Sequence, residues 1–132
     1  MNKIGLAPTS LATTGALEYI DAASRAGFEA IGMRFFRSPG LRYGFDPVVG
    51  DGAKMRDVKQ ALSASGMELM EVLSYYLQPE MDLDSMRPSL EFAAELGAKY
   101  ALLIGDDPEW ARMVVSRPLS TLAMHHHPFQ PD

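Results

Sequence analysis

A short pattern occurs three times between residues 15 and 104, and it limits the folds open to this chain. Each copy has an alanine-rich segment, one glycine, a small or apolar residue, one charged residue and then an apolar run of strand length. The glycines are Gly27, Gly66 and Gly97, so successive copies are 39 and 31 residues apart. A residue just past a helix often takes the left-handed conformation, which favours glycine, and we expect positive φ at all three. The spacing fits a helix, a turn, a strand and a loop, and predicts a βα array with a parallel sheet.

The predicted elements follow from this pattern and from the hydrophobic periodicity. Four strands are expected in sheet order 1-2-3-4, at residues 3–7, 28–35, 67–73 and 100–104, with the helices on one face. The first helix covers 16–26 with Thr14 as its N-cap and Leu17, Ile20 and Ala23 on its buried face. The second helix is capped by Asp51, and the third begins near Asp84 or Ser85 with Met86, Leu90, Ala93 and Ala94 buried. Asp107 and Pro108 are predicted to begin a fourth helix.

The repeating pattern stops near Arg112. Residues 113–132 hold one basic and one acidic residue, against 11 and 16 in residues 1–112, and they show no amphipathic period. We therefore expect a family-type domain at 1–112 and a disordered tail at 113–132. The three histidines, His125 to His127, are adjacent, so they cannot all face one ion in a folded site, and a disordered segment is the better interpretation.

Bulk composition excludes several classes of protein. The length of 132 residues suits one domain, and the net charge of −5 argues against nucleic acid or an anionic membrane as the main partner. The absence of cysteine rules out disulfides, thiolate nucleophiles and cysteine-ligated metals. No apolar stretch resembles a signal peptide or a membrane span, so a cytoplasmic protein is expected.

Candidate binding residues lie where the predicted strands end, because loops and helix N-termini of a parallel βα sheet converge there. They are Thr9 and Ser10, Arg34 and Arg37, Glu71 and Ser74 to Tyr76, and Asp106 and Asp107. Turn formation is the better explanation of Thr9 and Ser10, and helix capping is the better explanation of Asp107. Salt bridges explain Arg34, Arg37 and Glu71 about as well as substrate contacts do. The loop from Ala12 to Gly15 also suits an anion at a helix N-terminus, although it lacks the glycine-rich phosphate motifs.

Four segments together resemble the first half of sugar phosphate isomerases/epimerases of the xylose-isomerase-like superfamily. They are Ile4-Gly5-Leu6, Ala26-Gly27-Phe28-Glu29-Ala30-Ile31-Gly32, Ser65-Gly66-Met67-Glu68-Leu69-Met70-Glu71-Val72 and Glu95-Leu96-Gly97-Ala98-Lys99-Tyr100-Ala101-Leu102-Leu103. The resemblance implies part of a (β/α)₈ TIM barrel, about four βα units, from a metal-dependent enzyme acting on a sugar or a related polyhydroxy carbonyl compound.

In that family two glutamates, an aspartate and a histidine on later strands hold a divalent ion, such as manganese, magnesium, cobalt or zinc. No residue here matches those positions, so the resemblance assigns this chain no catalytic or metal-binding residue. From their positions where the predicted strands end, we expect Thr9, Arg34, Glu71 and Asp106 to form a substrate-side wall in a supporting role. A whole barrel needs about 250 residues, so we expect a truncated barrel that is inactive alone and prone to oligomerise through its open sheet edges.

Two alternatives remain open at this point. One is a complete flavodoxin-like domain that binds a phosphate or nucleotide with the loop from Pro8 to Gly15. The other is a non-catalytic half-barrel that forms a homodimer by pairing its open strand edges.

Overall fold

The computed structural model describes residues 3–37, 47–77, 82–105 and 122–124. Its elements, in chain order, are β1 (Gly5–Leu6), the 3₁₀ turn η1 (Pro8–Leu11), α1 (Ala16–Arg25), β2 (Ala30–Met33), α2 (Gly52–Ser65), β3 (Glu68–Leu77), the 3₁₀ turn η2 (Leu83–Met86), α3 (Arg87–Glu95), β4 (Tyr100–Gly105) and β5 (Leu122–Met124).

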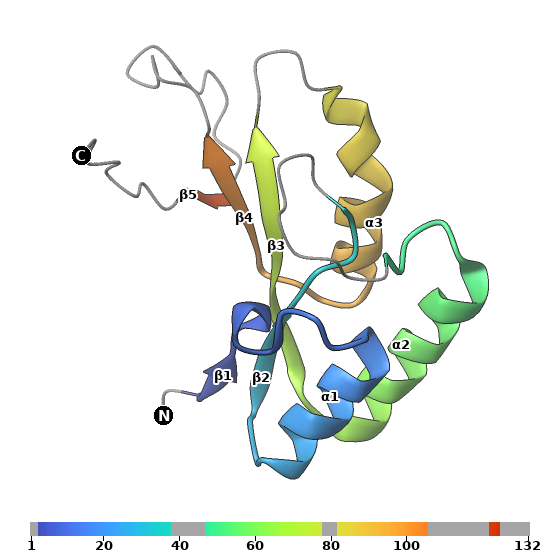
Figure 1. The fold of residues 1–132 in the computed structure, drawn as a ribbon, viewed down its shortest axis with the longest axis vertical. Coiled ribbons are helices and arrows are strands. Elements are labelled where there is room, and N and C mark those ends of the chain that lie inside the picture. Colours follow the sequence, from blue (N-terminus) through green and yellow to red (C-terminus); the bar gives the residue numbers. More distant parts are fainter. Residues whose placement is uncertain (1–2, 38–46, 78–81, 106–121, 125–132) are drawn as a thin grey trace.

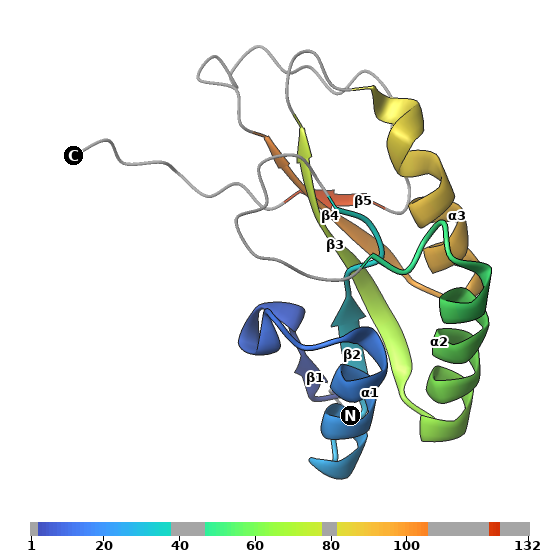
Figure 2. The same cartoon turned by 45° about the vertical axis from the view of Figure 1, so that its right-hand side comes forward.

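The strands form one parallel sheet in the order β1-β2-β3-β4-β5. The three α-helices lie on the same side of this sheet (Figures 1 and 2). This arrangement confirms the predicted order of the first four strands and the one-sided helix layer. It overturns the flavodoxin-like alternative, because that topology places the first strand between the second and the third, whereas here β1 pairs with β2 on the far side from β3.

A fifth strand was not predicted. Leu122–Met124 pairs in parallel with β4, with Leu122 opposite Ala101 and Met124 opposite Leu103. These three residues were expected in a disordered tail, and β4 was expected at an open edge. A three-residue strand is too short to show a hydrophobic period, so the sequence carried no signal for it. The predicted fourth helix, Asp107 and the rest of the segment from Met113 lie outside the described residues.

The glycines of the repeat behave as expected. Gly27, Gly66 and Gly97 have φ values of +81°, +69° and +85°. After α1, the amide of Gly27 donates to the carbonyl of Ser24, and the amide of Phe28 donates to that of Ala23. These bonds satisfy carbonyls that the last turn of α1 leaves unpaired, and they lead the chain from α1 towards β2.

The beginnings of the helices follow the prediction only in part. The Asp51 side chain accepts hydrogen bonds from the amides of Ala53 and Lys54 at 3.0 and 3.2 Å, which confirms it as the cap of α2. Thr14 does not cap α1. The N-cap is Gly15, which has no side chain to accept the first helical amides. The helix nevertheless begins at Ala16, as predicted, and ends at Arg25, one residue earlier than expected.

The core lies between the sheet and the helices. It is built mainly from large apolar side chains on β2, β3 and the facing helices, and Phe35 and Phe92 meet edge to face with ring centroids 5.0 Å apart. Two predicted faces need correction. Leu17 of α1 is 46% exposed, and Tyr19 takes an inward position instead. On α3, Ser89 and Phe92 are buried, whereas Leu90 is half-buried and Ala94 is exposed, so the helix is rotated from the predicted phase.

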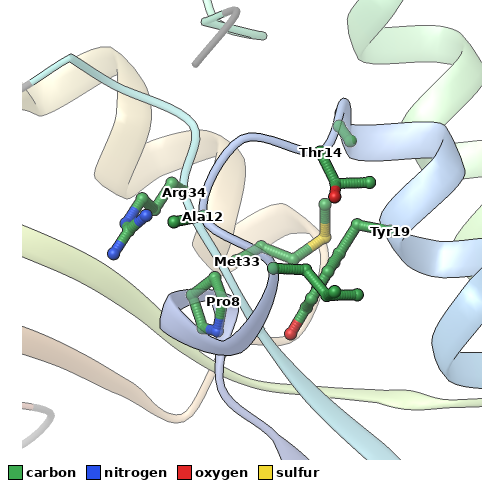
Figure 3. A pocket seen from close by; sticks show the side chains of 8 residues that line it. Pro8, Ala12, Thr14, Tyr19, Met33 and Arg34 are labelled. Carbon is green, nitrogen blue, oxygen red and sulfur yellow. The ribbon is translucent and has the colours of Figure 1, made fainter. Parts of the chain in front are cut away.

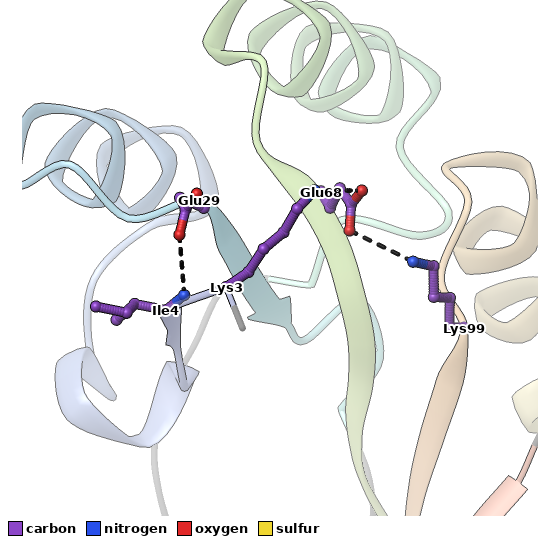
Figure 4. Close-up of polar contacts among 5 residues, drawn as sticks. All are labelled: Lys3, Ile4, Glu29, Glu68 and Lys99. Atoms are coloured by element: carbon purple, nitrogen blue, oxygen red, sulfur yellow. Dashed lines mark hydrogen bonds and ion pairs between the residues drawn. The ribbon is translucent and has the colours of Figure 1, made fainter. Parts of the chain in front are cut away.

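Charged groups at the amino ends of the strands are paired (Figure 4). Glu68, the first residue of β3, contacts Lys3 at 2.6 Å and Lys99 at 3.4 Å. The hydrogen bond from Lys3 is the largest cause of a lowered pKa at Glu68, and the positive charges of Lys3 and Lys99 add to it. Nearby, the Ile4 amide donates to the Glu29 carboxylate at 3.2 Å. These contacts tie together the segments that lead into β1, β3 and β4.

Candidate functional site

One face of the sheet, which we call the inner face, lies opposite the helices. On β2 and the residues after it, Ile31, Met33 and Phe35 belong to the helix-facing core. Because side chains alternate along an extended chain, Gly32 and Arg34 point to the inner face. Figure 3 shows the side chains of Met33 and Arg34 turned away from each other, as this alternation requires.

Gly32 makes room on the inner face for Glu71. The two residues are opposite each other in the β2–β3 register. A Cβ atom at Gly32 would lie 3.0 Å from Cγ of Glu71, 3.1 Å from its Oε1 and 3.0 Å from Cδ2 of Leu73. Contacts this short would displace the glutamate, so the position of its carboxylate depends on the missing side chain at residue 32.

Two charged side chains on this face lack partners. Arg34 is 7% exposed, and no group accepts a hydrogen bond from its buried Nε. Glu71 is half-buried, and within the described residues it takes part in no hydrogen bond or ion pair. Unpaired charge in a partly dry environment is costly, so this pair is the least satisfied polar feature of the described fold.

Tyr19 adds a third polar group that the sequence analysis did not select. Its hydroxyl donates to the Leu6 carbonyl at 2.7 Å and joins α1 to the end of β1. Burial raises the pKa of Tyr19 far above its usual range, the negative charge of Glu71 raises it further, and Arg34 opposes this in part. The sequence did hold one indication of this role, because a tyrosine on the apolar face of a helix is expected to be buried and a buried phenol usually has a polar partner.

A small cavity of about 30 Å³ is lined by Arg34 and Tyr19, but not by Glu71, and has room for about one water molecule. Figure 3 shows Arg34 and Ala12 on one side of it, Thr14 and Tyr19 on the other, and Pro8 below. Its lining residues come from η1, the start of α1 and the end of β2, and are Pro8, Leu11, Ala12, Thr14, Ala16, Tyr19, Met33 and Arg34. A larger, mostly apolar cavity of about 300 Å³ lies between α1 and α2, and among the candidate residues only Gly15, the last residue of the loop from Ala12, lines it.

The predicted wall residues fall in different environments. Arg34 directly follows β2, and Glu71 lies inside β3 because this strand continues to Leu77. Both charges act on Tyr19, so the fold brings them to one region. Thr9 is exposed in η1 next to the cavity-lining Pro8, and it does not itself line the cavity. Asp106 lies outside the described residues.

The segment Ser74 to Tyr76 also differs from expectation, because it belongs to β3 and does not follow it. Tyr75 is 2% exposed, and its hydroxyl lies 2.5 Å from the Ser89 Oγ on α3. Burial raises the pKa of Tyr75 to about 12, against a smaller opposing effect of the bond with Ser89. Tyr75 therefore serves the packing of α3 on the sheet.

The described residues do not fit a metal centre. They contain no group of three or more histidine, aspartate or glutamate side chains close enough to share an ion. Within the same part of the chain, no helix is both long and apolar enough to cross a membrane.

Comparison with known proteins supports the fold. No protein-family model and no curated protein sequence matches this chain. Among solved structures, an uncharacterised protein from Parabacteroides distasonis aligns with 96% of the chain at 14% identity, with a TM-score of 0.65. A xylose isomerase domain protein from Alicyclobacillus acidocaldarius aligns with 76% of it at 19% identity, with a TM-score of 0.50. The chain spans 53% and 35% of their respective lengths. At such low identity the likeness concerns fold alone: the chain forms an α/β unit of parallel strands that is consistent with part of a TIM-type barrel.

Proposed function

We propose that this chain forms the first half of a (β/α)₈ barrel enzyme, an isomerase or epimerase acting on a sugar, a sugar phosphate or a related polyhydroxy carbonyl compound. The observation that carries the proposal is the unpaired combination of Arg34 and Glu71 on the inner face, near the carboxyl end of β2. In parallel α/β barrels substrates bind at that end of the strands. The likeness in fold to a xylose isomerase domain protein also supports the proposal.

The role of this chain in such an enzyme is to hold and orient the substrate. Glu71 can accept hydrogen bonds from sugar hydroxyls, Arg34 can donate to an oxygen-rich group, and Thr9 and Asp106 complete the wall. A divalent ion would need ligands outside the described residues, because these do not suit one. Proton transfer next to the carbonyl would likewise need an acid and a base from later strands, so the chain alone is expected to give no turnover.

The test is binding of sugars to the full chain, followed by nuclear magnetic resonance of the backbone amides. Neutral ketoses and aldoses should shift the amides of Arg34, Glu71 and their neighbours, but not those on the exposed side of α2. Glu71→Gln should weaken the response, since it removes the charged acceptor. Glu68→Gln is the matched control, because it alters the ion-paired glutamate at the amino end of the same strand.

Two results would count against the proposal. One is the absence of any saturable sugar response at the inner face. The other is an equal effect of the two glutamate substitutions. Solvent deuterium appearing next to the sugar carbonyl in the presence of manganese would instead show that this chain carries its own catalytic centre, and would overturn the limited role given to it here.

A further inference from the structure

The larger cavity, of about 300 Å³, belongs to the helix layer and not to the inner face. Figures 1 and 2 show α1 and α2 side by side on the same face of the sheet. The cavity is lined by the four residues from Gly15 to Glu18 at the start of α1, by Val48 before α2, and by Lys54 and Val58 of α2. Neither Arg34 nor Glu71 lines it, so it is separate from the candidate site.

Small side chains at the start of α1 leave this space open. Gly15 has no side chain and Ala16 has only a methyl group. A Cβ atom added at Gly15 would have no other atom within 4 Å. Gaps larger than a water molecule are few in protein interiors, and the atoms that line such a gap lack contacts on one side. A ligand that fills the space would supply those contacts.

The lining favours an uncharged ligand. Val48 and Val58 are each 1% exposed and form its deep end, whereas Leu17 is 46% exposed at its mouth. Glu18 is exposed, and within the described residues it takes part in no hydrogen bond or ion pair. Lys54 is half-buried and already takes part in another interaction. A charged group placed against the valines would lose its hydration without gaining a partner.

The volume limits the size of the ligand. An apolar cavity of about 150 Å³ holds one benzene ring, and pockets for small molecules begin at about 300 Å³. The cavity between α1 and α2 therefore has room for a body about as large as a bicyclic ring.

We propose that the cavity between α1 and α2 binds a small uncharged ligand with an apolar body of about the size of a bicyclic ring. Such a ligand covers the exposed side chain of Leu17 and contacts Val48 and Val58. The site goes beyond the proposed function, because it lies on the opposite side of the sheet from Glu71 and takes a ligand of a different chemical class.

The experiment titrates the full chain with indole-3-methanol and follows its backbone amides by nuclear magnetic resonance. Saturable shifts are expected for residues 15–18 and for Val58, while the amides of Arg34 and Glu71 stay unchanged. Indole-3-carboxylate has the same rings and a similar size but carries a charge, and it should bind about tenfold more weakly or less. No saturable shift at the cavity, or equal binding of the two compounds, would overturn the proposal.

A variant that fills the cavity provides a second test. Gly15→Leu adds a side chain where an added Cβ meets no other atom, at a φ of −64° that leucine readily adopts, so the fold should persist and ligand binding should be lost. Ser24→Leu is the matched control, because it adds the same side chain at an exposed position near the other end of α1. Equal affinity in the two variants would contradict the site. If Gly15→Leu does not fold, the comparison of the neutral and the charged compound still decides.

The other possible occupant is a second copy of this chain, which could cover the exposed side chain of Leu17. Sedimentation of the full chain with and without indole-3-methanol distinguishes the two. The proposal predicts that the ligand leaves the oligomeric state unchanged. A dimer that both the ligand and Leu17→Ser dissociate would show that the cavity is a protein interface, and would overturn the proposal. The sugar-binding test reports on the inner face, so either site can fail without the other.

Discussion

Two glutamates of β3 lie three residues apart in opposite circumstances. Glu68, at the amino end of the sheet, is held by Lys3 and Lys99. Glu71 is half-buried over Gly32 and has no partner among the described residues. The Glu68 carboxylate joins segments that are distant in sequence. The Glu71 carboxylate instead occupies space that is open because residue 32 is a glycine without a side chain.

The same contrast separates the two ends of the sheet. Exposed, paired charges at the amino end contribute to holding the strands together, although exposed pairs add little each. Near the carboxyl end of β2, Arg34 is buried and unpaired. In α/β barrels one end of the sheet serves stability and the other binds the substrate. Under the proposed function, the unpaired charge marks the end that binds the substrate, and three predictions probe the contrast between the two ends.

The largest expected effect is loss of stability in alkali, from the buried tyrosines at the carboxyl side. The pKa of Tyr75 is raised from 10 to about 12, so the folded state keeps a proton that the unfolded state loses. Stability is full below pH 10 and falls as the pH rises towards 12, by about 2–3 kcal/mol from this residue. Urea unfolding at pH 8 and pH 11.5 measures it.

Tyr75→Phe should reduce that alkaline loss while lowering stability at pH 8, because Ser89 loses its partner. Tyr19, whose pKa is also raised, acts in the same direction. If Tyr75→Phe shows the same alkaline loss as the wild type, Tyr75 does not titrate as proposed.

A smaller effect is expected from Gly32→Ala. The added methyl group would press against Glu71 and Leu73 at about 3.0 Å, and forced contacts of this kind cost about 1–3 kcal/mol. Denaturant unfolding gives the cost, and the Glu71 resonances report the displacement. Gly15→Ala is the control, because Gly15 has no atom within 4 Å of an added Cβ and a negative φ of −64°. Equal costs at both positions would remove the argument that Gly32 positions Glu71.

The smallest effect should follow Glu68→Gln at the amino end. The pKa of Glu68 is lowered by Lys3 and Lys99, so its contribution is present above the ordinary glutamate pKa and disappears as the pH falls through the lowered value. Thermal melts from pH 7 to pH 2.5 should show a wild-type advantage at neutral pH that vanishes in acid and shrinks in high salt. An advantage that persists in acid would contradict the ion-pair explanation.

Local patterns were enough to predict most of the architecture. The glycines at 27, 66 and 97, the Asp51 cap and the order of four parallel strands were all predicted and confirmed. Each depends on interactions within a few residues or on the handedness of the βα connection. The proposed wall residues Arg34 and Glu71 could also be selected, because they belong to the same strand-end pattern.

Details that depend on packing were missed. The rotation of α3 that buries Ser89 and Phe92 is decided by the contacts of Phe92 with Phe35 and of Ser89 with Tyr75. The periodicity of apolar residues in the sequence predicts how wide the buried face of a helix is. It does not predict which side chains of the sheet the helix will contact, and those contacts decide how the helix is rotated. The hydrogen bond of Tyr19 could not be predicted for the same reason, since the Leu6 carbonyl that accepts it is 13 positions away in the sequence.

The sequence by itself therefore determined the repeat, the turns and the candidate charges, because glycine conformation, capping and side-chain alternation act locally. Only the tertiary structure decided that Glu68 is paired and Glu71 is not, and that Arg34 is buried beside the start of α1. Those facts depend on which strands and helices meet across dozens of residues, and on the space that Gly32 leaves between them.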